Sequence, residues 1–181
     1  MGVIFKQGLF LIKIHTLFIF PCIENNTKIC YTWLMESGIK AQIKDDNVYY
    51  FVQWSPLSLA ERWTINSRVP AVGGVYEIYW MDERKHLRMM MVGDTNYGGL
   101  RSEIRRLTDP ELALDPKLRK ILEDEEIWYR YAPCNSNKIM ADVVWFFRKT
   151  YFPENPGVEH SGRYKNIFLK ESAPDKLIWV P

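Results

Sequence analysis

The feature that most constrains this chain is a strand, turn, strand and helix pattern that runs without a break through residues 69–106. In residues 72–80 apolar side chains alternate with smaller or polar ones, which is typical of a half-buried strand. Residues 87–92 form a second strand-like run. The charged segment 81–86 between them cannot be buried cheaply, so it predicts a surface turn that pairs the two strands antiparallel.

A helix-like segment follows this predicted hairpin. Residues 94–99 are rich in turn formers, and apolar residues then recur at helical spacing through residues 100–107. Arg101 and Arg105 are four residues apart and therefore share one flank of the helix. Planar guanidinium groups in this arrangement suit phosphate oxygens, and the alternative is an ordinary solvated charged face.

The residues of this stretch resemble those of the GIY-YIG nuclease domain. The triplet from Gly74 to Tyr76 stands where the first signature lies, and the triplet from Met91 to Gly93 stands where the second lies. Thr95 belongs to the short polar pair that follows the glycine. The resemblance implies an endonuclease that cuts nucleic acid by metal-assisted hydrolysis of a phosphodiester bond.

The resemblance covers roughly residues 69–155 and implies a role for several side chains. Arg101, or Arg105 in its place, would stabilise charge on the scissile phosphate. Tyr76 would act as a base or orient the attacking water. The nucleic-acid site would include Gly74, Gly93, Thr95, Arg101 and Arg105.

The resemblance also implies a divalent metal, Mg²⁺ or Mn²⁺, held by a carboxylate in a later apolar helix. The family has a glutamate there, and Asp142 is the only carboxylate in the matching segment 137–147. The shorter side chain would misplace a metal by roughly 1 Å, so we expect weak activity. From the residues alone, Asp142 could instead make a cap-like hydrogen bond or a salt bridge to an arginine, because an unpaired buried carboxylate is costly.

These patterns predict an α+β fold with a small three-stranded antiparallel core sheet flanked by helices, in the order β-β-α-α-β-α, and an added N-terminal hairpin. Residues 127–132 form the third core strand, and Asp115 caps the helix before it. The apolar helix follows the strands rather than alternating with them, which argues against a parallel doubly wound sheet. The hairpin is expected in residues 39–54, followed by a helix that starts at Ser55.

Four segments are expected along the chain. Residues 1–34 are an apolar segment that we interpret as lying outside the native protein, which would then start at Met35; a signal peptide is the alternative. Its apolar run is shorter than the ~20 residues that a membrane span needs. The hairpin and helix extension then occupies 35–68, the nuclease-like domain 69–155, and a tail with one added strand 156–181.

Composition limits the classes of function. The net charge is +2, so nucleic-acid binding requires a local basic patch. Three cysteines without paired spacing indicate neither a zinc site nor a disulfide framework, which favours a cytoplasmic location. Three functions remain open: an endonuclease, a nucleic-acid-binding module that has lost its metal, and an interaction domain. The expected partners are nucleic acid, DNA rather than RNA, and a targeting protein, with no membrane.

Overall fold

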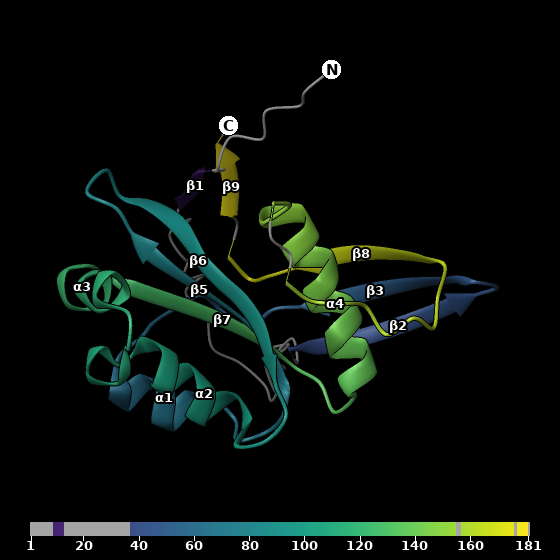
Figure 1. Cartoon of the computed structure of the whole chain (residues 1–181), viewed down its shortest axis with the longest axis horizontal. Helices are drawn as coiled ribbons and strands as arrows, with labels where there is room; N and C mark the ends of the chain where they lie inside the picture. Colours follow the sequence, from purple (N-terminus) through teal and green to yellow (C-terminus); the bar gives the residue numbers. More distant parts are fainter. Residues whose placement is uncertain (1–8, 13–36, 155–156, 176, 181) are drawn as a thin grey trace, which may run out of the picture.

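The computed structural model describes residues 9–12, 37–154, 157–175 and 177–180. Within them the chain forms two β-sheets and a set of helices (Figure 1). In chain order the elements are β1 (Leu9–Ile12), β2 (Gly38–Lys44), β3 (Asn47–Gln53), β4 (Ser58–Leu59), α1 (Arg62–Arg68), β5 (Gly74–Met81), β6 (His86–Thr95), α2 (Gly99–Thr108), the 3-10 helix η1 (Pro110–Leu112), α3 (Pro116–Asp124), β7 (Ile127–Pro133), α4 (Asn137–Tyr151), β8 (Asn166–Ser172) and β9 (Leu177–Val180).

The larger sheet has the strand order β4-β7-β5-β6-β1-β9, and every neighbouring pair in it is antiparallel. β5 and β6 are joined by the charged turn that the sequence predicts, so this hairpin is confirmed. β7 pairs with the other side of β5, which makes β5 an inner strand. Helices cover both faces of the sheet, and β5 is therefore buried along nearly its whole length.

The two faces of the larger sheet pack against different helices. On one face Tyr76 and Ile78 join a core with side chains of α1, α2 and α3. On the opposite face Val75 joins a second core with α4 and the smaller sheet. Alternation along β5 thus divides its side chains between the two faces of the sheet. At the end of the strand Tyr79 and Met81 join Leu87 in a third, smaller cluster.

The smaller sheet has the order β2-β3-β8. β2 and β3 form the predicted N-terminal hairpin, whose turn places Asp45 at a positive φ of 53°. β8 adds to the other side of β3 in parallel, with Val48 opposite Ile167 and Tyr50 opposite Leu169. In Figure 1 this sheet extends away from the larger sheet, and its free end is the β2–β3 turn.

Helix α4 lies between the two sheets (Figure 1). It begins where the sequence indicates, because the Ser136 hydroxyl accepts a hydrogen bond from the Ile139 amide. Met140, Val143 and Phe147 are buried in one core with residues of both sheets. A helix contacted from two sides must be apolar on most of its surface, which explains its composition.

The predicted fold class is wrong, because the chain has two sheets rather than one small three-stranded core sheet. The second sheet depends on β8, which pairs with a strand more than a hundred residues earlier, and local periodicity carries no sign of such a pairing. The helix expected from Ser55 is also misplaced. A short strand, β4, comes first and α1 begins at Arg62.

Of residues 1–34, which we interpreted as lying outside the native protein, the structure describes 9–12. These residues form β1, whose backbone pairs with β6 and β9. The rest of that segment lies outside the described residues.

A buried arginine connects the two sheets. Arg130 on β7 is only 4% exposed and forms ion pairs with Glu77 on β5 and with Glu171 on β8, the latter at 3.1 Å. Its guanidinium lies 4.6 Å from the centre of the Trp54 ring, and the Trp54 indole donates a 2.8 Å hydrogen bond to Glu171. The Tyr79 hydroxyl donates to Glu77 at 2.6 Å. The arginine is therefore enclosed by charged and aromatic groups of both sheets.

We predict that Arg130→Met destabilises the protein by about 3–5 kcal/mol, because it leaves Glu77 buried without its cation. The double variant Glu77→Leu with Arg130→Met should recover most of that loss, since an apolar pair of similar volume often replaces a buried ion pair without cost. Urea unfolding of both variants measures the two free energies. A loss below about 1 kcal/mol in the single variant would contradict the prediction.

Candidate nucleic-acid interface

The smaller sheet has one covered face and one open face. Alternate residues of β3, such as Tyr50 and Val52, point into the core with α4. The intervening residues and their neighbours on β2 and β8 lie on the other face. We use the name aromatic face for the part of this open face that is formed by Lys40, Lys44, Tyr49, Phe51, Phe168 and Lys170.

Three aromatic rings form the centre of the aromatic face. Tyr49 and Phe168 are cross-strand neighbours, and their rings stack with centroids 4.8 Å apart and planes inclined by 12°. Phe51 lies two residues along the same strand, a step of roughly 7 Å. Phe51 is 42% exposed and Phe168 is 46% exposed, so large ring surfaces face the solvent instead of the core.

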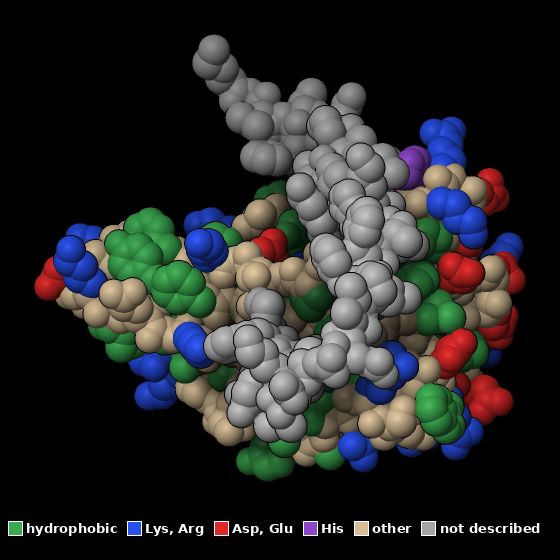
Figure 2. All heavy atoms as spheres, turned by 180° about the vertical axis from the view of Figure 1, so that it is seen from behind, with side chains coloured by type: hydrophobic (Ala, Val, Ile, Leu, Met, Phe, Trp, Pro, Cys, Tyr) green, Lys and Arg blue, Asp and Glu red, His purple; other side chains and the backbone are tan. Residues whose placement is uncertain are grey.

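Three lysines surround these rings. Lys40 and Lys170 lie on either side of Phe51 in the register of the three strands, and Lys44 lies nearer the turn. All three are exposed, and none of them forms an ion pair in the described part of the chain. Their charges are therefore available to an anion. Figure 2 shows hydrophobic side chains gathered over this sheet, with Lys and Arg side chains around them.

The residues expected to form a nuclease site are explained mainly by packing. Tyr76 is buried against α2, and burial raises the pKa of its phenol, which stays protonated at neutral pH and is a poor base. A Cβ on Gly93 would lie 2.5 Å from the Tyr76 hydroxyl. A Cβ on Gly74 would lie 2.6 Å from the Ala132 carbonyl oxygen. Both glycines are thus needed for close packing within the sheet.

The predicted arginines lie on the flank of α2 that faces α1. Arg101 donates a 2.8 Å hydrogen bond to the carbonyl oxygen of Val69, the residue that directly follows α1. Arg105 lines a small surface hollow together with Arg62 and Ile65 of α1. Thr95 is buried, and its hydroxyl donates to the Tyr97 carbonyl oxygen at 3.3 Å. Arg101 therefore has a structural partner, and a nucleic-acid role for these residues stays a prediction.

Asp142 is fully buried in α4 and is surrounded by hydrogen-bond donors. Its carboxylate accepts hydrogen bonds from the Tyr50 hydroxyl at 2.6 Å, the Ser161 amide at 2.6 Å and the Arg163 guanidinium at 3.1 Å. Burial alone would raise its pKa, but these three donors outweigh burial and hold the pKa below the usual 3.8. The salt bridge to an arginine, one of the partners open from the sequence, is present.

The structure does not bring the predicted site residues together. Tyr76 and the two arginines of α2 lie on one face of the larger sheet, whereas Asp142 lies on the other with α4. The groups around Asp142 donate hydrogen bonds, and such donors do not fit a divalent cation. In the described segments no three His, Cys, Asp or Glu side chains gather as metal ligands would. We derive no chemical step through Mg²⁺ or Mn²⁺.

Sequence reasoning missed the aromatic face. It placed this strand in the N-terminal hairpin expected in residues 39–54 and assigned no binding role to it. The available signal was the position of Tyr49, Tyr50 and Phe51, since three consecutive aromatic residues must place rings on both faces of a strand. Only Tyr50 is used by the core.

The sequence matches the model of one protein family. A family model described as "Uncharacterised protein" matches residues 38–181, and the chain belongs to this family. No curated protein and no solved structure matches it. The predicted membership of the GIY-YIG family is wrong, because this other family is the one that matches. The signature triplets are short, and packing accounts for their glycines.

The sequence predicts no contact with a membrane, and the helices of the structure test the part of this prediction that concerns membrane spans. None of the helices in the described residues has the length and apolar character that crossing a membrane requires.

We predict that Asp142→Asn loses stability in a pH-dependent way. The folded-state pKa is lowered, so the ionised carboxylate stabilises the fold above about pH 4, and this contribution disappears as the pH falls through the folded-state value. The variant should be less stable by about 1.5–3 kcal/mol near neutral pH, and the difference from the wild type should be smaller near pH 3.

Urea unfolding at the two pH values measures this difference. Asp124→Asn, an exposed change near the end of α3, is the matched control and should alter stability little at either pH. A deficit in Asp142→Asn that is equal at both pH values would show that its charge is not responsible.

Proposed function

We propose that the protein binds single-stranded nucleic acid on the aromatic face. The observation that supports this proposal is the stack of half-buried Tyr49 on exposed Phe168, with exposed Phe51 beside it and lysines around it that form no ion pair within the described residues. Single-strand binding sites combine these two components, because base faces stack on aromatic rings and cations follow the phosphate backbone.

The arrangement favours unpaired bases over a duplex. In a double helix the ring faces of the bases are occupied by their neighbours, so a flat protein surface can stack only on bases that are free. The step of roughly 7 Å between Tyr49 and Phe51 allows two separate contacts along one extended strand. The lysines lie at both sides of the sheet, where they can contact phosphates while the bases contact the rings.

The stack of Tyr49 on Phe168 contributes to the pairing of β3 with β8, but it leaves large parts of the Phe51 and Phe168 rings exposed. Exposed rings on a sheet promote aggregation unless something covers them, so a surface of this kind indicates a partner. A protein partner would be expected at a surface with few lysines, because lysine is depleted in protein interfaces. The three lysines, which form no ion pair in the part of the chain that the structure describes, therefore favour a polyanion. DNA and RNA share the base rings and the phosphate charges that this surface would bind. We also propose that the protein is cytoplasmic.

The proposal predicts that Phe51→Ala weakens binding of oligonucleotides of about ten nucleotides by about tenfold, since each stacked base contributes about 1–3 kcal/mol. Fluorescence anisotropy with labelled single-stranded DNA and RNA measures the affinity. Tyr97→Ala is the matched control, because Tyr97 is 98% exposed and lies on the larger sheet's side of the molecule. That variant should bind as the wild type does.

The lysines are tested separately through salt. Lys40→Gln should reduce the slope of log affinity against log salt by about 0.7, the value for one phosphate contact on a single strand. Lys120→Gln, an exposed change on α3, should leave the slope unchanged. No binding by the wild type would overturn the proposal. A dimer that dissociates in Phe51→Ala would instead assign the face to a second copy of the chain.

A further inference from the structure

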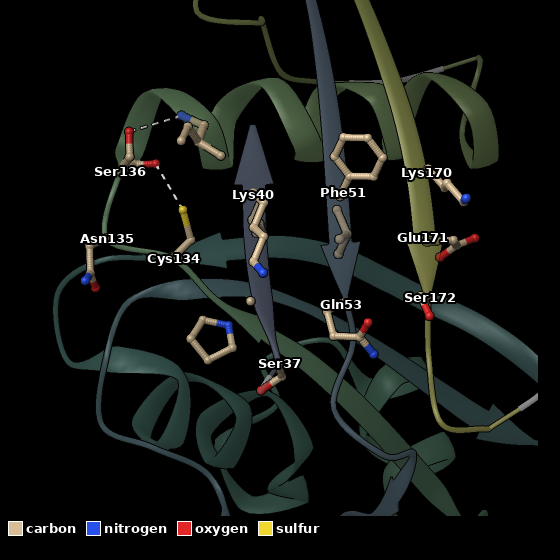
Figure 3. Close-up of a pocket in the computed structure, with 15 residues that line it drawn as sticks. Ser37, Lys40, Phe51, Gln53, Cys134, Asn135, Ser136, Lys170, Glu171 and Ser172 are labelled. Carbon is tan, nitrogen blue, oxygen red and sulfur yellow. Dashed lines mark hydrogen bonds between the residues drawn. The ribbon is translucent and has the colours of Figure 1, made fainter. Parts of the chain in front are cut away.

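A hollow of about 970 Å³ adjoins the aromatic face. It lies between the first residues of β2, the last residues of β3 and β8, and the turn 133–136 that leads into α4 (Figure 3). Lys40, Phe51 and Lys170 line it as well as belonging to the aromatic face. A strand bound on the aromatic face would therefore pass the mouth of this hollow.

Gln53, at the end of β3, lines the hollow and has an unsatisfied donor. Its Nε2 atom is buried and has no hydrogen-bond acceptor, and no other buried unpaired side-chain atom of the described residues lines this hollow. Buried polar groups in folded proteins nearly always have partners, so this amide requires an explanation.

The register of the smaller sheet leaves room around Gln53. Its neighbours on the two adjoining strands are Gly38 and Ser172, whose side chains are absent or small. Elsewhere along the same face the neighbours are long or aromatic, as in the row of Lys40, Phe51 and Lys170. In Figure 3 the Gln53 amide and the Lys40 side chain both extend from the sheet beside the hollow.

We infer that this hollow is a base-recognition pocket and that Gln53 reads the edge of the base that enters it. The inference rests on the proposed function and adds a residue that determines specificity. We assign adenine as this base, since the donor and the acceptor of a side-chain amide pair with the N7 acceptor and the N6 amino group of adenine. Cytosine and thymine also carry a donor beside an acceptor on their Watson–Crick edges, so the strands compared below include both pyrimidines.

The other lining residues fit this assignment. Phe51 offers a ring at the mouth, on which the neighbouring base can stack. Lys40 and Lys170 supply positive charge for the phosphates on either side of the recognised base. The Lys40 side chain is exposed and lines the hollow together with Gln53, whose Nε2 atom is buried in the unbound protein, so a base that pairs with this amide requires a local rearrangement of the Gln53 side chain.

The test compares the affinities of oligo(dA), oligo(dC) and oligo(dT) of about ten nucleotides for the full chain, with oligo(rA) as the RNA arm. The wild type should bind oligo(dA) about tenfold tighter than the pyrimidine strands. Replacing adenine by 7-deazaadenine, which lacks the N7 acceptor, should remove most of this preference without any change to the protein.

The variant Gln53→Leu should lower the preference for oligo(dA) to about twofold or less while the pyrimidine strands still bind through the aromatic face. A general stacking preference for purines would survive this change. Gln42→Leu is the matched control, because Gln42 lies on the same face but does not line the hollow, and it should keep the full preference.

The possible results distinguish failure of the base-recognition inference from failure of the proposed single-strand binding. Equal binding of adenine and 7-deazaadenine strands, or a preference that persists in Gln53→Leu, overturns the inference while the proposed function stands. Failure of the wild type to bind any of the strands overturns the proposed function itself.

Discussion

The buried guanidinium of Arg130 and its two ion pairs join the two sheets of this structure. Arg130 belongs to the larger sheet, yet it contacts Glu171 of the smaller sheet and lies against Trp54, which follows β3. Because a buried charge is tolerated only with its partners in place, the network fixes one position of the smaller sheet relative to the larger. Glu171 also lines the hollow beside the aromatic face, so this network positions the proposed binding surface.

Helix α4 holds the smaller sheet from its covered face through the carboxylate of Asp142. The Asp142 carboxylate receives hydrogen bonds from Tyr50 on β3 and from Ser161 and Arg163, which precede β8. One buried charge on α4 thereby fixes the two strands that carry the aromatic rings. Tyr50 faces inward to this carboxylate, and its neighbours Tyr49 and Phe51 must then face outward. The inward position of Tyr50 in the core and the outward position of Tyr49 and Phe51 therefore have the same cause, which is the alternation of side chains along β3.

Neighbouring side chains of β5 face opposite sides of the larger sheet, and this explains why the predicted nuclease residues do not come together. Odd and even residues of a strand face opposite sides of a sheet. Tyr76 therefore packs with α2, while α4 and Asp142 lie behind the same strand. Two elements that are close in space can thus place their side chains in different cores, and spacing along the chain does not reveal which face a later helix will cover.

The sequence by itself determined the local elements of this protein. Period-two alternation and charged turns predicted both hairpins, and the cap at Asp115 marked a helix start, because these signals act between residues close in the chain. Only the tertiary structure decided the second sheet, the partners of Asp142 and the exposure of Phe51. Each depends on contacts between distant segments, above all the parallel pairing of β3 with β8. Such pairings are selected by the packing of the whole chain, which local patterns do not encode.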